Sequence, residues 1–579
     1  MTSSNDVAEK SPELGDKRRV SRSKLSRLSP YTLFPPLAVL AFVMAYPLFM
    51  VLYGSFRGGP PGVDAPFSFD GYVRGWTDWG VHKALITTFA LAVPRIFLGL
   101  SLATILAWII TRTNTPMRSM LEQLVWFRFF LPMLPITMSW VMIAGGKTGF
   151  VHALFGVSLD IRSYWGIVLM STMIGGSLGY FFIAPAFRSM DAALEESSRV
   201  SGASNMTTLR RITAPLLAPA ILGAASLYLL FLLSSYETEM VLGSGKGIYV
   251  FTTYIWHTMS KVPVDYPQAM ALSSVFMLFV SIVILLNFKL LGGRQFTTVT
   301  GRGFGLRPTD LGTWKWVTFA GVIFYFLFAS ILPLAVLIAG TFQGTWGVTS
   351  SSWTLRHWQE ALSDSEVLRS VRNTLFLGLL VATASAILYS FMSYGYLRTK
   401  LRGRHAIEVL TWVPRMAPGI VLAVGVVWAV LGGIPGIRFL YGTLFLMAIV
   451  VVVENTPTGM RITNGGMVQL GAELEESARI SGAGWFQTVR RIVLPLLAPT
   501  LLSSWLLGFL AGTRALLIVM FLYLPSSRVL SLDIFERWQS IEWEEAAVLG
   551  VILTAITVIV AAIAQVVAAR QRKAMDVTV

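Results

Sequence analysis

Twelve long apolar segments divide this chain, and they restrict its fold more than any other feature of the sequence. An α-helix rises about 1.5 Å per residue, so roughly 20 apolar residues are needed to cross about 30 Å of hydrocarbon. Hydrophobic residues make up 54% of the chain and charged residues 13%, which excludes an ordinary soluble domain. We therefore expect an all-α polytopic membrane protein with about 12 transmembrane helices. The expected spans are residues 31–53, 83–110, 122–146, 165–187, 216–242, 268–290, 316–341, 370–397, 407–431, 441–463, 496–524 and 546–568.

The basic residues of the chain alternate between the two sides of these spans. More than half of the 46 Lys and Arg fall in segments that share one side with the N-terminus. Under the positive-inside rule both termini are then cytoplasmic, and the net charge of +16 is explained without any nucleic acid. Residues 1–30 are polar, basic and poor in apolar residues, so we expect a disordered cytoplasmic tail. Because the chain has no cysteine, disulfides and thiolate metal ligands are excluded.

One polar stretch between the apolar segments occurs twice. LEESSRVSGASNMTTLRRITAPLLAP at 194–219 aligns without a gap with LEESARISGAGWFQTVRRIVLPLLAP at 474–499, and 17 of the 26 positions are identical. Six spans lie on either side of a basic linker, so the repeat is parallel and both polar loops face the same side. The expected organisation is a tail (1–30), a first module (31–290) with its loop at 188–215, a linker (291–315), a second module (316–570) with its loop at 464–495, and a cytoplasmic tail (571–579).

The repeated loop has the composition of two short helices joined by a glycine turn. Helix formers run up to Arg479, and Gly482 and Gly484 can then end the helix. A second amphipathic segment leads to Pro495, at the start of the next apolar run, where a missing N–H does little harm. A plain charged connector would need no second copy in the same register. We therefore interpret the loops as docking sites for a partner that has two like sites.

The loop resembles the "EAA" loop of ABC importer permeases. The second copy carries the pattern at Glu476, Ser477, Ala478, Gly482, Ile492, Leu494 and Pro495. The first copy matches it at Glu196, Gly202, Ile212 and Pro215, and departs from it at Ser198 and Ala214. Since both modules carry the loop, the resemblance is closest to the fused, two-module permeases of the ferric-iron importer type. It implies a type I importer fold of two parallel six-helix repeats in a bacterial inner membrane.

The resemblance also implies partners and site residues. The loops would dock on two separate ATP-binding subunits, through Glu195, Glu196, Arg199 and Gly202 in the first copy and Glu475, Glu476, Arg479 and Gly482 in the second. An extracytoplasmic solute-binding protein would deliver ferric iron or a related small solute such as thiamine, a polyamine or a phosphonate. ATP and Mg²⁺ would be held by the partner subunits, so no cofactor is expected on this chain.

The sequence contains neither a complete phosphate-binding loop nor a histidine motif of the kind that enzymes use. The segment GGKTG at 145–149 lacks the first Gly of a phosphate-binding loop, since that position is Val141. The five histidines are scattered and include no His-x-x-x-His pair, so neither a catalytic site nor a metal site is expected.

Ionisable residues inside the spans are candidates for the solute path, because a charge in the bilayer is costly. Arg95, Glu454 and Arg514 are expected either to line that path or to pair with one another between helices. Arg128 and Arg415 are shallower and are expected to reach the interface by snorkelling.

Other acidic residues are weaker candidates for a site. Glu237 and Glu239 are two residues apart and point in different directions on a helix, which makes a poor chelating pair. The acidic residues of the outer loops are expected to be solvated or to contact a binding protein: Asp533, Glu536, Glu542, Glu544 and Glu545.

The alternative function is a secondary transporter driven by an ion gradient. A parallel repeat of six and six spans alone fits that class as well. It gives no reason for two matching polar loops on one side of the membrane, so the ATP-driven importer is preferred.

Overall fold

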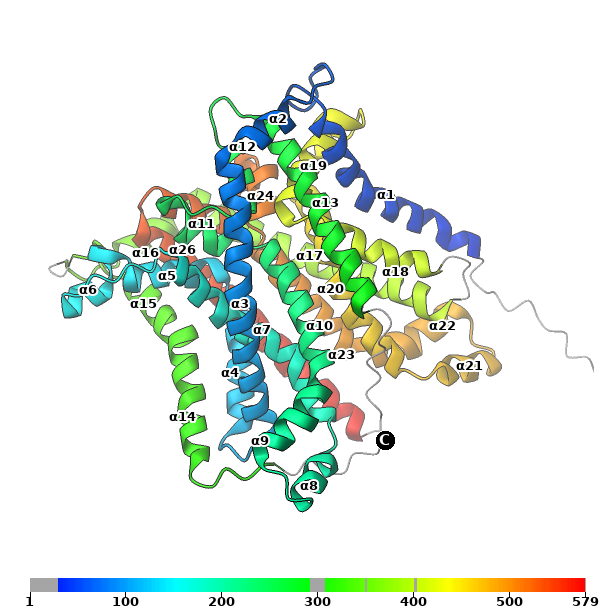
Figure 1. Cartoon of the computed structure of the whole chain (residues 1–579). Helices are drawn as coiled ribbons and strands as arrows, with labels where there is room; N and C mark the ends of the chain where they lie inside the picture. Colours follow the sequence, from blue (N-terminus) through cyan, green and yellow to red (C-terminus); the bar gives the residue numbers. More distant parts are fainter. Residues whose placement is uncertain (1–29, 292–307, 349–350, 400–403, 578–579) are drawn as a thin grey trace, which may run out of the picture.

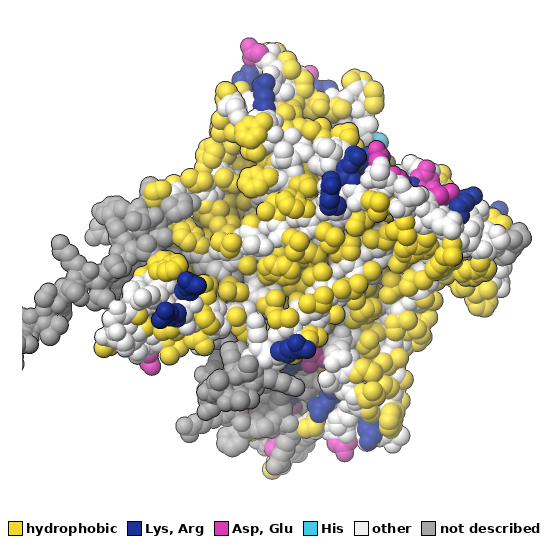
Figure 2. All heavy atoms as spheres, turned by 180° about the vertical axis from the view of Figure 1, so that it is seen from behind, with side chains coloured by type: hydrophobic (Ala, Val, Ile, Leu, Met, Phe, Trp, Pro, Cys, Tyr) yellow, Lys and Arg dark blue, Asp and Glu magenta, His cyan; other side chains and the backbone are white. Residues whose placement is uncertain are grey.

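The computed structural model describes residues 30–291, 308–348, 351–399 and 404–577, and the regular structure of these residues is helical. Ten helices are long and apolar enough to cross a membrane, and two bent pairs raise the number to 12 if each pair is one span. Figure 2 shows a broad apolar surface in the middle of one face, with charged side chains toward its margins. The chain is therefore an all-α polytopic membrane protein, as predicted. Most of the expected N-terminal tail and linker lies outside the described residues.

The long helices of the two halves follow one another in the same order (Figure 1). The first half contains α1 (Pro30–Ser55), α2 (Asp70–Thr77), α3 (Trp79–Arg112), α4 (Arg118–Phe130), α5 (Met133–Ala144), α6 (Phe150–Phe155), α7 (Tyr164–Ser189), α8 (Ala192–Val200), α9 (Asn205–Thr208), α10 (Ala214–Leu233), α11 (Glu237–Leu242), α12 (Phe251–Met259) and α13 (Tyr266–Leu291). The second contains α14 (Trp314–Phe326), α15 (Leu332–Gly340), α16 (Arg356–Ser363), α17 (Ser365–Arg398), α18 (Arg404–Trp412), α19 (Gly419–Trp428), α20 (Leu444–Gln469), α21 (Ala472–Ile480), α22 (Trp485–Thr488), α23 (Leu494–Thr513), α24 (Leu517–Leu522), α25 (Leu530–Gln539) and α26 (Trp543–Val577). Equivalent helices have equal lengths: α3 and α17 have 34 residues, α7 and α20 have 26, and α10 and α23 have 20.

Equivalent hydrogen bonds fix the register of the repeat. The hydroxyl of Thr88 on α3 accepts from the backbone N–H of Phe251 at 2.9 Å, and the hydroxyl of Thr374 on α17 accepts from that of Leu530 at 2.8 Å. These two threonines are 374 − 88 = 286 residues apart, whereas the polar loops repeat at 474 − 194 = 280. The connection between α3 and α7 is therefore six residues longer than its counterpart (286 − 280 = 6).

The third and ninth predicted spans are not straight helices. The α4–α5 pair bends by 95°, and the corresponding pair in the second half, formed around α18 and α19, bends by 94°. At the two bends, Leu131 (ψ 131°) precedes Pro132 and Ala417 (ψ 116°) precedes Pro418. A proline ring pushes the preceding residue out of the helical region, so the helix ends at each of these positions. Hydropathy does not register such a bend, so the bends within these two spans were not predicted.

The fifth and eleventh predicted spans are also broken. After α10 and after α23 the chain leaves the helix for three residues, and short helices α11 and α24 follow. Hydroxyl groups replace the backbone N–H donors that are missing at each break. The hydroxyl of Thr252 donates to Ser235 O at 2.6 Å, and that of Ser531 donates to Ala515 O at 3.1 Å. Non-helical backbone at membrane depth is tolerated only where such partners or a cavity satisfy it.

The halves are joined by reciprocal packing. Helix α1 packs against α13 of its own half and α19 of the other half, while α15 packs against α5 of the first half and α26 of its own. Thus the first span of each half, which is α1 in the first half and α14 with α15 in the second, contacts the bent segment of the other half. The breaks of all four interrupted segments meet between the two halves, which is where the cavity described below lies.

Candidate coupling loops and translocation cavity

The two polar loops end their first helix in the same way. Gly202 follows α8 with φ +80° and Gly482 follows α21 with φ +85°. The next N–H in each loop reaches back to the helix, from Ala203 to Ser198 O at 3.1 Å and from Ala483 to Ala478 O at 3.0 Å. This is a Schellman-type end, which favours glycine in the left-handed conformation. A Cβ at either glycine would meet no atom within 4 Å, so each turn is an exposed projection.

The sequence predicted two short helices in each loop, but the second of them is not a separate element. The short helices α9 and α22 continue through a π-helical turn, Leu209–Thr213 or Val489–Val493, into the long helices α10 and α23. Pro215 and Pro495 follow these turns. Proline lacks an N–H and crowds the carbonyl four residues before it, and a π turn relieves both problems. The loop is therefore mechanically continuous with a membrane span.

The acidic pair of each loop divides into an exposed and a buried member. Glu196 and Glu476 are exposed, whereas the side chains of Glu195 and Glu475 are only 13% and 9% exposed. Arg199 and Arg479 belong to α8 and α21, and their side chains lie outside the described part of the chain. In Figure 1 both helices lie at the lower side of the molecule, toward the C-terminal end of α26. We call this side the loop end.

In the first half, Glu195 ties the loop to the end of α3. Its carboxylate pairs with Arg112 at 2.9 Å and accepts from the hydroxyl of Thr213 at 2.9 Å. Arg112 is 3% exposed and also donates to Met190 O at 3.2 Å. One buried arginine therefore holds both the end of α7 and the start of the loop.

In the second half, Glu475 ties the loop to the end of α17 by related contacts. Its carboxylate pairs with Arg398 at 3.4 Å, and the hydroxyl of Tyr394 donates to it at 3.2 Å. The indole of Trp485 in turn donates to Tyr394 at 2.9 Å, and Arg398 donates to Met467 O at 2.9 Å.

Sequence reasoning missed both arginines, although a signal was present. Arg112 and Arg398 are 398 − 112 = 286 residues apart, so they become equivalent only in the register of α3 and α17. The remaining contacts differ between halves: Thr213 has Val493 as its counterpart, and Tyr394 has Trp108. The two halves thus share the ion pair between the glutamate and the arginine, but they differ in the side chains that form hydrogen bonds with that glutamate.

A cavity of about 460 Å³ lies where the four interrupted segments meet. It is lined by both halves and contains five charged side chains: Arg128, Glu237, Arg415, Glu454 and Arg514. Arg128 and Arg415 come from the two bent segments, Glu237 and Arg514 from the two breaks, and Glu454 from the middle of α20. Interrupted spans at matching positions of two repeats are the usual site of solute binding in transporters.

The arginines of the cavity are held in different ways. Arg514 donates to Phe129 O at 3.3 Å and also to Phe130 O, so it caps the C-terminal end of α4 from the other half. Arg128 is 4% exposed, and its Nε and Nη2 have no hydrogen-bond partner. The expectation that Arg128 and Arg415 snorkel to the interface was wrong, because the bends turn both toward the cavity.

Arg95 is placed apart from the other two intramembrane candidates. Its Nη1 donates to Glu239 at 2.6 Å, and the two side chains are 2% and 0% exposed. It lines neither of the cavities described here, while Glu454 and Arg514 both line the first. As expected, Glu237 and Glu239 diverge, one toward the cavity and one toward Arg95.

A second cavity, of about 710 Å³, adjoins the first and extends toward the loop end. The two share residues that include Arg415 and Thr458. The second is mostly apolar and aromatic, and its additional cation, Arg461, lies over the ring of Trp412 at 4.6 Å. Together the two cavities extend from the breaks toward the loop end.

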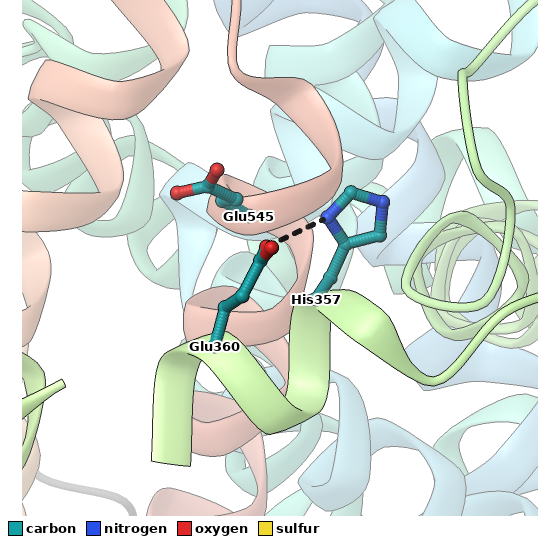
Figure 3. A group of neighbouring side chains, drawn as sticks. All are labelled: His357, Glu360 and Glu545. Carbon is teal, nitrogen blue, oxygen red and sulfur yellow. Dashed lines mark ion pairs between the residues drawn. The ribbon is translucent and has the colours of Figure 1, made fainter. Parts of the chain in front are cut away.

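The structure also gathers one group that sequence spacing did not indicate (Figure 3). His357 and Glu360 on α16 lie beside Glu545 on α26, with candidate ligand atoms within 4.8 Å of one another. His357 Nδ1 is 3.9 Å from Glu360. Glu545, however, is already neutralised by an ion pair with Arg537. A metal would have to displace that guanidinium, so we assign none to this group.

Most of the acidic residues of the outer loops are not simply solvated. Asp533 and Glu536 both pair with Arg528, and Glu542 pairs with Arg537 as Glu545 does. Burial raises the pKa of Asp533, although Ser370 and Arg528 donate to it. These side chains are structural contacts between α25, α26 and their neighbours.

Comparison with known proteins identifies relatives of both halves. Residues 377–573 match the family described as binding-protein-dependent transport system inner membrane component. A putative ferric transport system permease protein of Haemophilus influenzae is 26% identical over 395 residues, which cover 66% of this chain and 61% of the relative. A ferric transport system permease protein of Actinobacillus pleuropneumoniae is 24% identical over 418 residues, covering 70% of this chain and 60% of that protein.

Solved structures show a more distant likeness. A chain from the crystal structure of a bacterial ABC transporter that imports the acidic polysaccharide alginate superimposes with a TM-score of 0.38 and 18% sequence identity. The match covers 45% of this chain and 96% of the other. The matched region spans less than two thirds of the two ferric relatives named above.

Proposed function

We propose that this chain, which resembles the ferric-type permeases of ABC importers, is the membrane subunit of an ATP-driven importer. It forms the solute path between its two halves and receives the closure of two separate ATP-binding subunits through its loops. A solute-binding protein outside the membrane delivers the solute. The names of the relatives favour ferric iron as the solute, and thiamine, a polyamine or a phosphonate is the alternative.

The observation that carries this proposal is the construction of the two loops. Each presents an exposed glutamate, Glu196 or Glu476, on a helix that ends at an exposed left-handed glycine. Each is also tied by a buried ion pair to a long membrane helix and continues without interruption into another. A partner that moves the exposed helix therefore moves two spans of the same half. Two such elements can bias a two-state equilibrium of the cavity through differential binding.

The test is purification of the chain from its native membranes in a mild detergent. We expect two ATP-binding subunits per chain and ATP hydrolysis that vanadate inhibits. The double variant Glu196→Lys and Glu476→Lys should lose both while the chain remains in the membrane.

Glu366→Lys provides the matched control, because Glu366 is exposed at the opposite end of α17. Normal copurification with the double variant would remove the docking role of the loops. Uptake that persists without ATP and collapses with the ion gradient would identify a secondary transporter instead.

A further inference from the structure

We infer that the solute bound in the central cavity is a small anion with carboxylate, phosphate or phosphonate oxygens, and that Arg128 is its principal contact. This inference rests on the proposed function, because it names the class of solute for the same cavity. It separates anionic solutes from polyamines, thiamine and the bare ferric ion, which the relatives alone do not.

The charged side chains of the central cavity do not balance. Three arginines and two glutamates line the cavity, so its formal charge is 3 − 2 = +1. Glu237 interacts electrostatically with Arg514, and Glu454 with Arg415. Within the described part of the chain, no carboxylate pairs with Arg128. The excess charge is therefore located at one residue.

The Arg128 guanidinium is buried and incompletely hydrogen-bonded. It is 4% exposed, and two of its nitrogens have no partner. A buried cation at membrane depth is costly unless it is paired and hydrogen-bonded. Because Arg128 lines the cavity, an anion there would supply the missing opposite charge. Arginine suits this role, because its planar fork matches carboxylate and phosphate oxygens.

The carboxylate and phenol oxygens that a bare ferric ion prefers are already engaged in this cavity. The hydroxyl of Tyr389 is used in a hydrogen bond to Val452 O at 2.7 Å, and that of Tyr236 points to the sulfur of Met520 at 3.7 Å. The two carboxylates face arginines, as described above. A ferric ion would thus have to enter as an anionic chelate. The volume of about 460 Å³ suits a small metabolite or such a chelate.

The experiment is thermal unfolding of the full chain in lipid nanodiscs, followed by tryptophan fluorescence at constant ionic strength. The probes are phosphate, methylphosphonate, citrate and ferric citrate, with spermidine and thiamine as cations. We expect at least one anion to raise the unfolding temperature in a saturable manner. Ferric citrate acting alone would indicate a chelate, and phosphate or methylphosphonate acting alone would indicate a phosphorus oxyanion.

The Arg128→Gln variant should bind the stabilising anion about tenfold or more weakly, as expected when a hydrogen bond to a charged group is lost. It should also unfold at a higher temperature than the original when no anion is present, because an unpaired buried cation has been removed. Glu454→Gln should increase the affinity for the anion, because it removes a negative charge from the cavity. Arg356→Gln should leave the affinity unchanged, because Arg356 lies outside the cavity with a side chain that is 63% exposed. Stabilisation by spermidine or thiamine alone, or an anion effect that survives Arg128→Gln, would overturn the inference. No ATP-binding subunit is needed, so its failure is distinguishable from failure of the importer proposal.

Discussion

Arg95 and Glu239 form a buried ion pair of 2.6 Å in the first half, and the second half has valines at the equivalent positions. In the registers established above, Arg95 corresponds to Val381 (95 + 286) and Glu239 to Val519 (239 + 280). Both valines are 0% exposed. The same architecture is thus completed once by an ion pair and once by apolar packing.

Replacing only one partner of this pair should destabilise the protein strongly. Arg95→Val or Glu239→Val leaves an uncompensated buried charge, which costs about 3–5 kcal/mol. The double variant Arg95→Val with Glu239→Val reproduces the second half and should recover most of that loss, since apolar replacement of a buried pair is often neutral or stabilising. Thermal unfolding and the yield of monodisperse protein measure this. If the double variant unfolds at as low a temperature as the single variants, apolar packing cannot replace the ion pair at this position.

The two glutamates of each loop should have different roles in coupling. Glu475→Gln removes the ion pair to Arg398 and the charge that strengthens the hydrogen bond from Tyr394, a bond of about 1.5–3 kcal/mol, while the exposed surface of α21 stays intact. We expect normal copurification of the ATP-binding subunits but several-fold less uptake per ATP hydrolysed. Glu476→Lys should instead reduce copurification. Equal effects of both substitutions on copurification would contradict this division.

The left-handed glycines should tolerate no side chain without cost. Gly482→Ala places a Cβ at φ +85°, a conformation that costs an ordinary residue about 1–2 kcal/mol. We expect a lower unfolding temperature or faster proteolysis of the loop, together with reduced uptake. Gly484→Ala is the control, because Gly484 has φ −68° and equally open surroundings. If both substitutions are neutral, the turn is not under conformational constraint.

The start of α3 should give the protein a pH-dependent contribution at low pH. Burial raises the pKa of Asp78, but hydrogen bonds from Tyr254, Gln268 and the N–H of Gly80 outweigh it and hold that pKa below its ordinary value. A lowered folded pKa stabilises the protein above the unfolded value of about 3.9, and this contribution is lost as pH falls through the folded pKa.

Asp78→Asn should therefore lower stability by about 0.5–2 kcal/mol at neutral pH. The difference from the original protein should stay constant from about pH 8 to 5 and shrink below about pH 4. Asp64→Asn, at a fully exposed side chain, should have no such profile. A difference that grows on acidification would show that the sign assigned to Asp78 is wrong.

The sequence predicted the all-α class and the positions of the spans, because apolar length and the loop repeat are local signals. It did not predict the bends, although Pro132 and Pro418 were visible within the third and ninth segments. A hydropathy average treats proline as one more apolar residue and ignores its effect on the residue before it.

The candidate site was predicted less completely, for reasons of register and pairing. The exposed glutamates and the glycines follow from one aligned segment, whereas Arg112 and Arg398 repeat at a different spacing. Arg128 was expected at the interface because its depth was judged from a straight helix. Which charge meets which across the two halves depends on tertiary contacts such as that of Arg514 with the end of α4.

The reciprocal packing of α1 and α19 also bears on how the protein is made. As the chain is synthesised, α1 is made before α13 and α19, and α13 of its own half packs against it. Its other face stays in lipid until α19, in the ninth apolar segment, has been inserted. Helix α1 therefore reaches its final environment only after part of the second half has been made, so assembly of the first half is completed by the second.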